Sequence, residues 1–351
     1  MPAPIISAAL SFAGVAMLAL TTSAAQSQTV EEFYKGKTLS IYSGLSAAGA
    51  YGAYARLLER HIGKYIPGHP VTVLRLMEGG TGLTLANWLY NIGPKDGLSF
   101  GIFHERIGLE PVVAPRGTQF DGRKFTWIGS MAKQTSVCFT RLDSKVKTWQ
   151  DARKLSIPVG ADAAAASDSV MPRMMNAMLG TKFQIIHGYG AGVTLAIERG
   201  EVEGRCGWGW ASLKATKPEW NEPNKINILA QFSFKAHPEL PNVPVMMDLV
   251  DKAEDKRALE LIFATQEMGR PFAAPPGVPA DRAAALRKAF MEVLKDPELL
   301  AEAKKQRLEI NPITGEEITD LLVGLYDTPK EIVERVNSFR TGSAGEQTIQ
   351  K

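Results

Sequence analysis

Cysteine, histidine and clustered charge are scarce in this chain, and each shortage excludes a class of function. The 351 residues include two cysteines and five histidines. None of these residues recurs at the spacing of a zinc site, so we expect no metal. The 40 basic and 37 acidic residues give a net charge of +3 without a run of lysine or arginine. Because nucleic-acid binding needs a clustered basic surface, we expect no nucleic-acid partner.

One long apolar segment lies at the N-terminus. It runs from Ile5 to Leu20, and the first charged side chain is Glu31. The small residues at 23–25 follow the pattern that signal peptidase cleaves. We therefore predict a signal peptide over residues 1–25 that is cleaved after Ala25 and exports the chain. A retained membrane anchor is the alternative, since the segment could just cross the ~30 Å of hydrocarbon in a bilayer, but its alanine, serine and glycine content favours the signal.

The two cysteines bear on the redox compartment of the chain. No Cys-x-x-Cys motif is present. An even number of cysteines in an oxidising compartment permits one disulfide, between Cys138 and Cys206. Two buried free thiols are the alternative, and the sequence leaves both open.

Short β-favouring runs alternate with helical runs along the mature sequence. Strands are predicted at 37–43, 71–76, 98–103, 125–129, 135–140, 157–160, 183–187 and 226–231. Helices are predicted at 54–65, 83–92, 170–179 and 192–200, and again over most of the chain from about residue 232. A strand–helix–strand order implies parallel sheets with helices on their faces, so we predict an α/β fold built from two α/β units.

Helix starts are predicted in the C-terminal part from two capping boxes. Thr314 is followed three residues later by Glu317, and Thr328 by Glu331, which is the spacing of a capping box. Pro329 would then stand at the first helical position of the second helix.

Glycine-rich turns follow several of the predicted strands. Ligands bind at this edge of open α/β sheets, and the free N–H groups of a helix N-terminus stabilise a carboxylate or phosphate. Four such turns therefore predict an anion-binding cleft. Its candidate residues are Ser43, Gly49, Ala50, Tyr51, Gly80 and Thr81 in the first unit and Asp162, Ser167, Asp168, Gly188, Tyr189 and Gly190 in the second. Tyr51 and Tyr189 are expected to close over the ligand, with packed surface aromatics as the alternative.

Charged residues near these turns have two interpretations. Asp162 and Asp168 would repel a carboxylate unless they cap a helix or hold water. Arg205 is a candidate counter-ion for an anionic ligand, and a salt bridge to Glu201 or Glu203 is the alternative.

Enzyme signatures are absent from the sequence. It contains no nucleotide-binding Gly-x-x-x-x-Gly-Lys-Ser/Thr or Gly-x-Gly-x-x-Gly motif, and Gly44 to Ala48 lacks the second glycine of a hydrolase elbow. Ser144 and Lys147 match a Ser-x-x-Lys pattern, but its companion motifs are missing. We therefore expect neither an enzyme nor a cofactor, and an exported hydrolase on a two-domain α/β scaffold is the alternative.

Several motifs occur in a fixed order along the mature chain. They are Tyr34-x-Gly36-Lys37-Thr38 with Ala55-Arg56-Leu57-Leu58, Glu78-Gly79-Gly80-Thr81, Pro94-Lys95-Asp96-Gly97, His187-Gly188-Tyr189 with Glu198-Arg199-Gly200-Glu201-Val202, and the proline-rich segments 238–244 and 275–279. In this order the sequence resembles the substrate-binding proteins of tripartite tricarboxylate transporters, the Bug-type receptors, over nearly its whole mature length. It departs from the family at Gly52, where the family has an aspartate, and at Glu78 and Thr81, which replace a proline and a glycine.

The resemblance implies a type II periplasmic binding protein fold, with a ligand cleft between two α/β domains and hinge strands that cross between them. Domain 1 would comprise residues 30–131 and 232–351, and domain 2 residues 132–231, with hinges near 130–136 and 231–235. The resemblance further implies a periplasmic receptor that captures a small organic acid by domain closure and delivers it to integral-membrane permease subunits. A receptor of an ABC or TRAP-type importer is the alternative.

Overall fold

The computed structural model describes residue 1 and residues 28–164, 166–341 and 347–348. Apart from residue 1, the predicted signal peptide therefore lies outside the described residues. In the part of the chain that the structure describes, no helix is both long enough and apolar enough to cross a bilayer.

A six-stranded sheet with the order β11-β4-β10-β3-β1-β2 organises the first lobe of the molecule. Its strands are β1 (Thr38–Ser43), β2 (Val71–Leu76), β3 (Ser99–Ile102), β4 (Thr126–Ser130), β10 (Pro271–Ala274) and β11 (Ile313–Thr314). β1 is parallel to β2 and β3, whereas β10 runs antiparallel to β3 and β4. β3 is buried along its whole length, as expected for a parallel strand covered on both faces.

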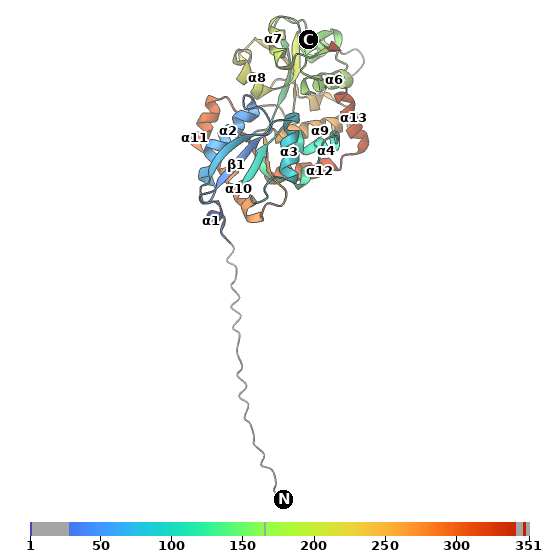
Figure 1. Ribbon diagram of the computed structural model, residues 1–351. Coiled ribbons are helices and arrows are strands. Elements are labelled where there is room, and N and C mark those ends of the chain that lie inside the picture. Colours follow the sequence, from blue (N-terminus) through green and yellow to red (C-terminus); the bar gives the residue numbers. More distant parts are fainter. Residues whose placement is uncertain (2–27, 165, 342–346, 349–351) are drawn as a thin grey trace.

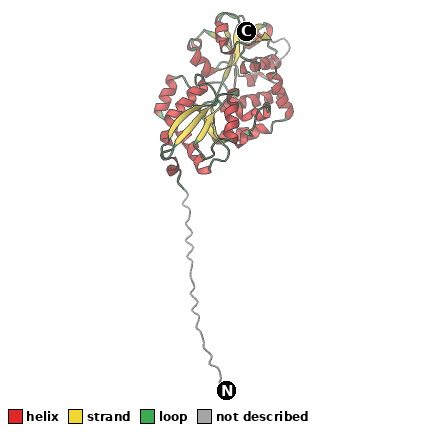
Figure 2. Ribbon diagram, viewed as in Figure 1, coloured by secondary structure: helices red, strands yellow, loops and turns green. Residues whose placement is uncertain are grey.

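Helices enclose this sheet, as Figures 1 and 2 show. They are α1 (Val30–Tyr34), α2 (Ala50–Ile62), α3 (Leu83–Asn91), α4 (Glu110–Val113), α10 (Ala280–Val293), α11 (Pro297–Lys305) and α12 (Gly315–Tyr326). Leu57 of α2 and Phe290 of α10 share one buried core with Ile41 of β1. Leu89 of α3 and Leu322 of α12 belong to a second core. The apolar faces of these helices thus build the first lobe from both ends of the chain.

A second six-stranded sheet, with the order β12-β7-β6-β8-β5-β9, organises the second lobe. Its strands are β5 (Ser136–Arg141), β6 (Ile157–Gly160), β7 (Phe183–His187), β8 (Gly204–Gly209), β9 (Ile226–Phe232) and β12 (Gln347–Thr348). Its helices are α5 (Trp149–Lys154), α6 (Ser167–Leu179), α7 (Val193–Glu198) and α8 (Trp210–Thr216). β6 is parallel to β7 and β8, so the carboxyl ends of these strands meet at one edge.

A disulfide joins Cys138 of β5 to Cys206 of β8. The two cysteines are partners in the antiparallel register of these strands, and both are fully buried. The covalent link therefore lies inside the core of the second lobe.

The chain connects the two lobes more than once. β4 leads directly into β5, and β9 returns to β10 through α9 (Ala253–Met268). Phe263 of α9 lies in the core of the second lobe, whereas Leu261 lies in a core of the first. Phe339 of α13 (Lys330–Arg340) also lies in the core of the second lobe. The segment after residue 232 thus contributes to both lobes, and the domain boundaries drawn from the sequence stay a prediction.

The two predicted capping boxes have different outcomes. Thr314 caps α12 and forms the reciprocal bonds with Glu317, as expected. α13 begins at Lys330 with Pro329 as its N-cap and without a side-chain cap, so the prediction for Thr328 is wrong. The helix starts one residue later than that box requires, which leaves the Thr328 hydroxyl outside capping position.

Candidate functional site

The carboxyl ends of β1, β2 and β3 lie at one edge of the first sheet, and the predicted site residues of the first lobe follow them. Ser43 ends β1; it is fully buried, and its hydroxyl donates a hydrogen bond to the Leu45 carbonyl at 2.8 Å. Gly49 is the N-cap of α2 and Ala50 its first residue. Ser43 therefore shapes the turn, while Gly49 and Ala50 lie at a helix N-terminus as predicted from the sequence.

The second turn leads from β2 into α3 through left-handed backbone. Gly79, Gly80 and Gly82 have φ angles of 142°, 54° and 99°, and Thr81 between them has a φ of 55°. Gly80 and Thr81 are exposed. A β-branched residue with positive φ is strained, so this turn is held in its shape by its surroundings. The result is an exposed loop in left-handed backbone that directly follows β2.

The second-lobe candidates lie in two loops that contact each other. The Gly188 N–H donates to the Asp162 carbonyl at 3.2 Å, and the Tyr189 N–H donates to the Ala161 carbonyl at 3.4 Å. Gly190 follows in the same loop with a φ of 56°. The loops after β6 and β7 are therefore joined by backbone hydrogen bonds, which brings Asp162, Gly188, Tyr189 and Gly190 together.

The helices that begin at these edges lack side-chain caps. Gly49, Gly82 and Ala166 are the N-caps of α2, α3 and α6, and none of them offers a side-chain acceptor. By contrast, threonines cap α1, α5 and α12. α9 and α10 also lack a side-chain cap. A missing cap therefore suggests an anion site only where the helix begins at the carboxyl end of a strand. The first N–H groups of α2 and α6 can therefore serve a bound anion. Those of α3 are engaged, because Leu83 and Thr84 donate to the Gly80 and Gly79 carbonyls.

Asp168 and Arg205 form an ion pair beside the start of α6. The Arg205 guanidinium donates to Asp168 at 2.7 Å and lies over the Trp208 ring at 4.9 Å. Among the described residues, Asp168 is the acidic partner of Arg205, so the suggested bridge to Glu201 or Glu203 is wrong. Burial raises the pKa of Asp168, and the Arg205 charge opposes that rise.

A buried polar cluster that the sequence did not reveal lies between the lobes. The Tyr51 hydroxyl donates to the Glu105 carboxylate, and the Arg270 guanidinium lies over the Tyr51 ring at 4.4 Å. Gln134 donates to Glu105 at 3.1 Å and accepts from Arg270 at 2.8 Å. Burial raises the pKa of Glu105, whereas Arg270 lowers it. Tyr51 therefore links the first turn of α2 to Gln134 and Arg270, which stand in the two connections between the lobes.

A cavity with a volume of about 60 Å³ lies where the lobes meet. Glu105 and Arg106, which follow β3, line it from the first lobe, and Ser167 lines it from the second. Burial lowers the pKa of the neighbouring His104 well below its usual value. His104 and Glu105 were not among the residues predicted from the sequence, although their position directly after a strand was a usable signal.

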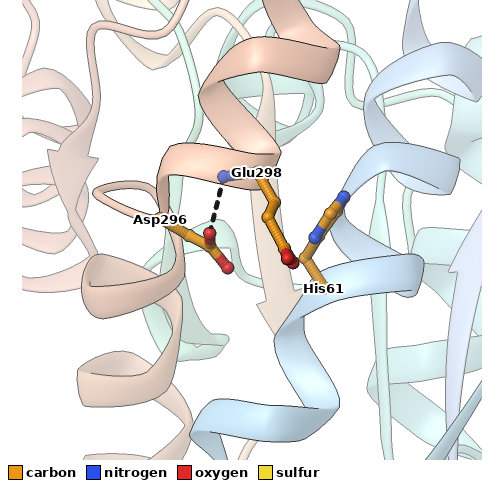
Figure 3. A group of neighbouring side chains, drawn as sticks. All are labelled: His61, Asp296 and Glu298. Carbon is orange, nitrogen blue, oxygen red and sulfur yellow. Dashed lines mark hydrogen bonds between the residues drawn. The ribbon is translucent and has the colours of Figure 1, made fainter.

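A cluster of possible metal ligands lies away from this edge. Ligand atoms of His61, Asp296 and Glu298 lie within 4.8 Å of one another (Figure 3). Asp296 caps α11 by accepting from the Glu298 N–H at 2.8 Å. The Lys64 ammonium contacts both carboxylates, and His61 pairs with Glu302 at 2.8 Å. Because an ammonium already occupies the place between the carboxylates, we interpret this cluster as a structural ion-pair group.

The fold is similar to that of solved solute-binding proteins. A TctC solute binding protein from Polaromonas superposes with a TM-score of 0.64 at 17% identity, over 86% of this chain and 99% of that one. The periplasmic binding protein BugD gives 0.63 at 17% identity, over 90% and 100%. Rpa4515 of R. palustris, solved with adipate, gives 0.61 at 15% identity, over 89% and 99%. This chain has the fold of a periplasmic binding protein.

The predicted α/β periplasmic binding protein fold is thereby confirmed. No protein-family model matches the sequence, and no curated protein matches it. Of the predicted site residues, Ser167 lines the cavity between the lobes. The assignment of individual ligand-binding residues stays a prediction.

Proposed function

We propose that this chain is a Bug-type receptor that captures a small organic carboxylate in the periplasm. The observation that carries the proposal is the cavity between the lobes, which is lined by Glu105 of one lobe and Ser167 of the other. The uncapped N-termini of α2 and α6 supply donors and positive helix-dipole potential at the edges of the two sheets. The adipate bound to the similar Rpa4515 supports a carboxylate as the ligand.

Capture in this proposal is a domain closure without a chemical step. Backbone N–H groups of the Gly80–Thr81 turn and of the α2 N-terminus hold the carboxylate from the first lobe. Ser167 and the Gly188–Gly190 loop close on it from the second. Rotation takes place in the connections near 130–136 and 231–235, and the closed receptor delivers its ligand to the permease subunits in the membrane.

The hydrolase alternative has one concrete candidate in the structure. Ser169 Oγ lies 3.0 Å from His187 Nδ1, which is a nucleophile–base distance. Ser169 is fully buried, and its hydroxyl also lies 2.8 Å from the Ala163 carbonyl. A nucleophile must reach its substrate, so this pair is better explained as packing inside the second lobe.

Thermal unfolding with a panel of organic acids tests the proposal. A carboxylate at about 100 times its Kd should stabilise the native state by about 2.7 kcal/mol, whereas its uncharged amide should not. Recovery of the acid unchanged after incubation distinguishes a receptor from an enzyme. Stabilisation by no organic acid, or conversion of the bound one, would reject the receptor.

A designed variant tests the place of binding. Gly49→Asp puts a carboxylate on the free N–H groups of α2, and a Cβ at Gly49 meets nothing closer than 3.7 Å. We expect the variant to fold and to lose at least about 10-fold in affinity, because its own anion competes with the ligand. Lys252→Asp is the matched control, since Lys252 is the uncapped N-cap of α9. Equal affinity in both variants would place the ligand elsewhere.

A further inference from the structure

The cavity between the lobes is lined by the apolar faces of several helices. Ser167, Val170 and Met171 lie three and four residues apart on one face of α6, and Leu261, Ile262 and Thr265 present a face of α9. Leu109 and Val113 contribute from the first lobe, and Val336 contributes from α13. Apart from Ile262, these apolar side chains are no more than 8% exposed. The cavity is therefore a preformed apolar space.

The charged groups on the cavity wall are already paired within the protein. The Glu105 carboxylate accepts from Tyr51 and from Gln134. Arg106 and Arg340 both lie near the Glu110 carboxylate, at 4.0 and 3.7 Å. A second ligand carboxylate placed here would meet the Glu105 charge and would have to compete with Glu110 for Arg106 and Arg340. It would therefore lose its water for little gain.

The size of the cavity limits what it can hold. A water-sized group needs roughly 10–15 Å³ of such space, so about 60 Å³ accommodates about four to six non-hydrogen atoms. Ser167, the first residue of α6, lies on the wall. A carboxylate at the uncapped start of α6 is therefore next to the opening of an apolar space of that size.

We infer that the ligand of this receptor carries one carboxylate and, at its other end, an uncharged apolar group of about four carbons that fills the cavity. The inference rests on the proposed function and narrows it to amphipathic monocarboxylates, in place of acids that are charged at both ends. Each methylene that leaves water contributes about fourfold in affinity, so the apolar end dominates selectivity.

A matched pair of ligands tests the inference on the unmodified protein. Pentanoate and glutarate share a five-carbon backbone, and glutarate has a second carboxylate where pentanoate has a methyl group. Titration calorimetry should give pentanoate at least about 10-fold higher affinity than glutarate and than acetate. Glutarate, citrate or malate binding as tightly as pentanoate would overturn the inference and leave the carboxylate receptor standing. Binding of none of these acids would overturn both.

Two cavity variants test whether the apolar end of the ligand binds in this cavity. Val336→Phe fills the cavity and should cost pentanoate at least about 10-fold in affinity, with acetate unchanged, whereas Val323→Phe on the exposed face of α12 should bind as the wild type does. Leu261→Ala enlarges the space and should move the preferred acid to one or two carbons longer. The proposal that the apolar end binds in this cavity would be rejected by two results together. These are equal pentanoate affinity in both phenylalanine variants and an unchanged chain-length preference in Leu261→Ala. If Val336→Phe does not fold, the chain-length series on Leu261→Ala decides.

Discussion

At the scale of single residues, Asp168 shows how a carboxylate is tolerated beside the proposed anion site. It is 3% exposed and accepts two hydrogen bonds from Arg205. Both charges belong to the second lobe, so Asp168 has its counter-ion without a ligand. The Arg205 side chain thereby neutralises a group that would otherwise repel a bound carboxylate.

Removal of Arg205 alone should lower the free energy of unfolding more than removal of both charges of the pair. Arg205→Gln leaves Asp168 buried without its cation, so we expect a loss of about 3 kcal/mol in the free energy of unfolding. Asp168→Asn combined with Arg205→Gln should recover most of that loss, because no uncompensated charge remains. Urea denaturation of the two variants measures the difference. A double variant as unstable as Arg205→Gln would show that packing of the guanidinium on Trp208 is the dominant contribution.

At the scale of elements, the Cys138–Cys206 disulfide ties β5, which follows the first connection between the lobes, to β8 in the middle of the second sheet. It closes a loop over a sequence separation of 68 residues. The link therefore restricts the unfolded chain over most of the second lobe.

Loss of this bridge should weaken the second lobe more than any single surface change. The free energy of unfolding of the double variant Cys138→Ala/Cys206→Ala should be about 2–5 kcal/mol lower than that of the oxidised protein. Guanidinium denaturation followed by near-UV circular dichroism measures this. The disulfide assignment itself is checked by thiol titration of the denatured protein, which should find no free thiol until a reductant is added. Two free thiols in the unreduced protein would contradict it.

At the scale of the whole molecule, an ion-pair group joins the lobes on one side. Glu309, which follows α11 in the first lobe, lies 2.8 Å from the Lys214 ammonium of α8 and 3.5 Å from His237. The Tyr54 hydroxyl donates to the Glu309 carbonyl at 2.9 Å and fixes that segment. Lys214 also pairs with Glu239. These charges stabilise the present relative position of the lobes.

The pH dependence of stability should report this contact. Burial alone would raise the pKa of Glu309, but hydrogen bonds from His237 and Lys214 hold it at about 2, below the ordinary 4.5. The lowered pKa contributes stability that is fully present above pH 5 and is lost as pH falls from about 5 towards 2. The stability difference between wild type and Glu309→Gln should therefore shrink over that range in urea denaturation. Glu331→Gln, at an exposed site on α13, is the control. A stability difference between wild type and Glu309→Gln that stays constant with pH would refute the role given to Glu309.

Much of the fold and part of the candidate site follow from the sequence, because they depend on neighbours within a few residues. The strand predicted at 71–76 is β2, and the strand predicted at 183–187 is β7. Gly49 and Ser167 lie at the helix starts where the glycine-rich turns predicted an anion site. Strand alternation, helix caps and glycine turns are local signals, so one chain is sufficient to find them.

Only the tertiary structure decided which distant side chains meet. Glu105 comes before the second-lobe segment of the sequence and Arg270 comes after it. Both nevertheless lie in one buried cluster with Tyr51. Val336 near the C-terminus lines the same cavity as Ser167 and Glu105. Such contacts arise when helix faces from separate parts of the chain pack together, and no local pattern records which faces those are. The glycine-rich turns at the helix starts were therefore predictable from the sequence, whereas the apolar cavity between the lobes was not.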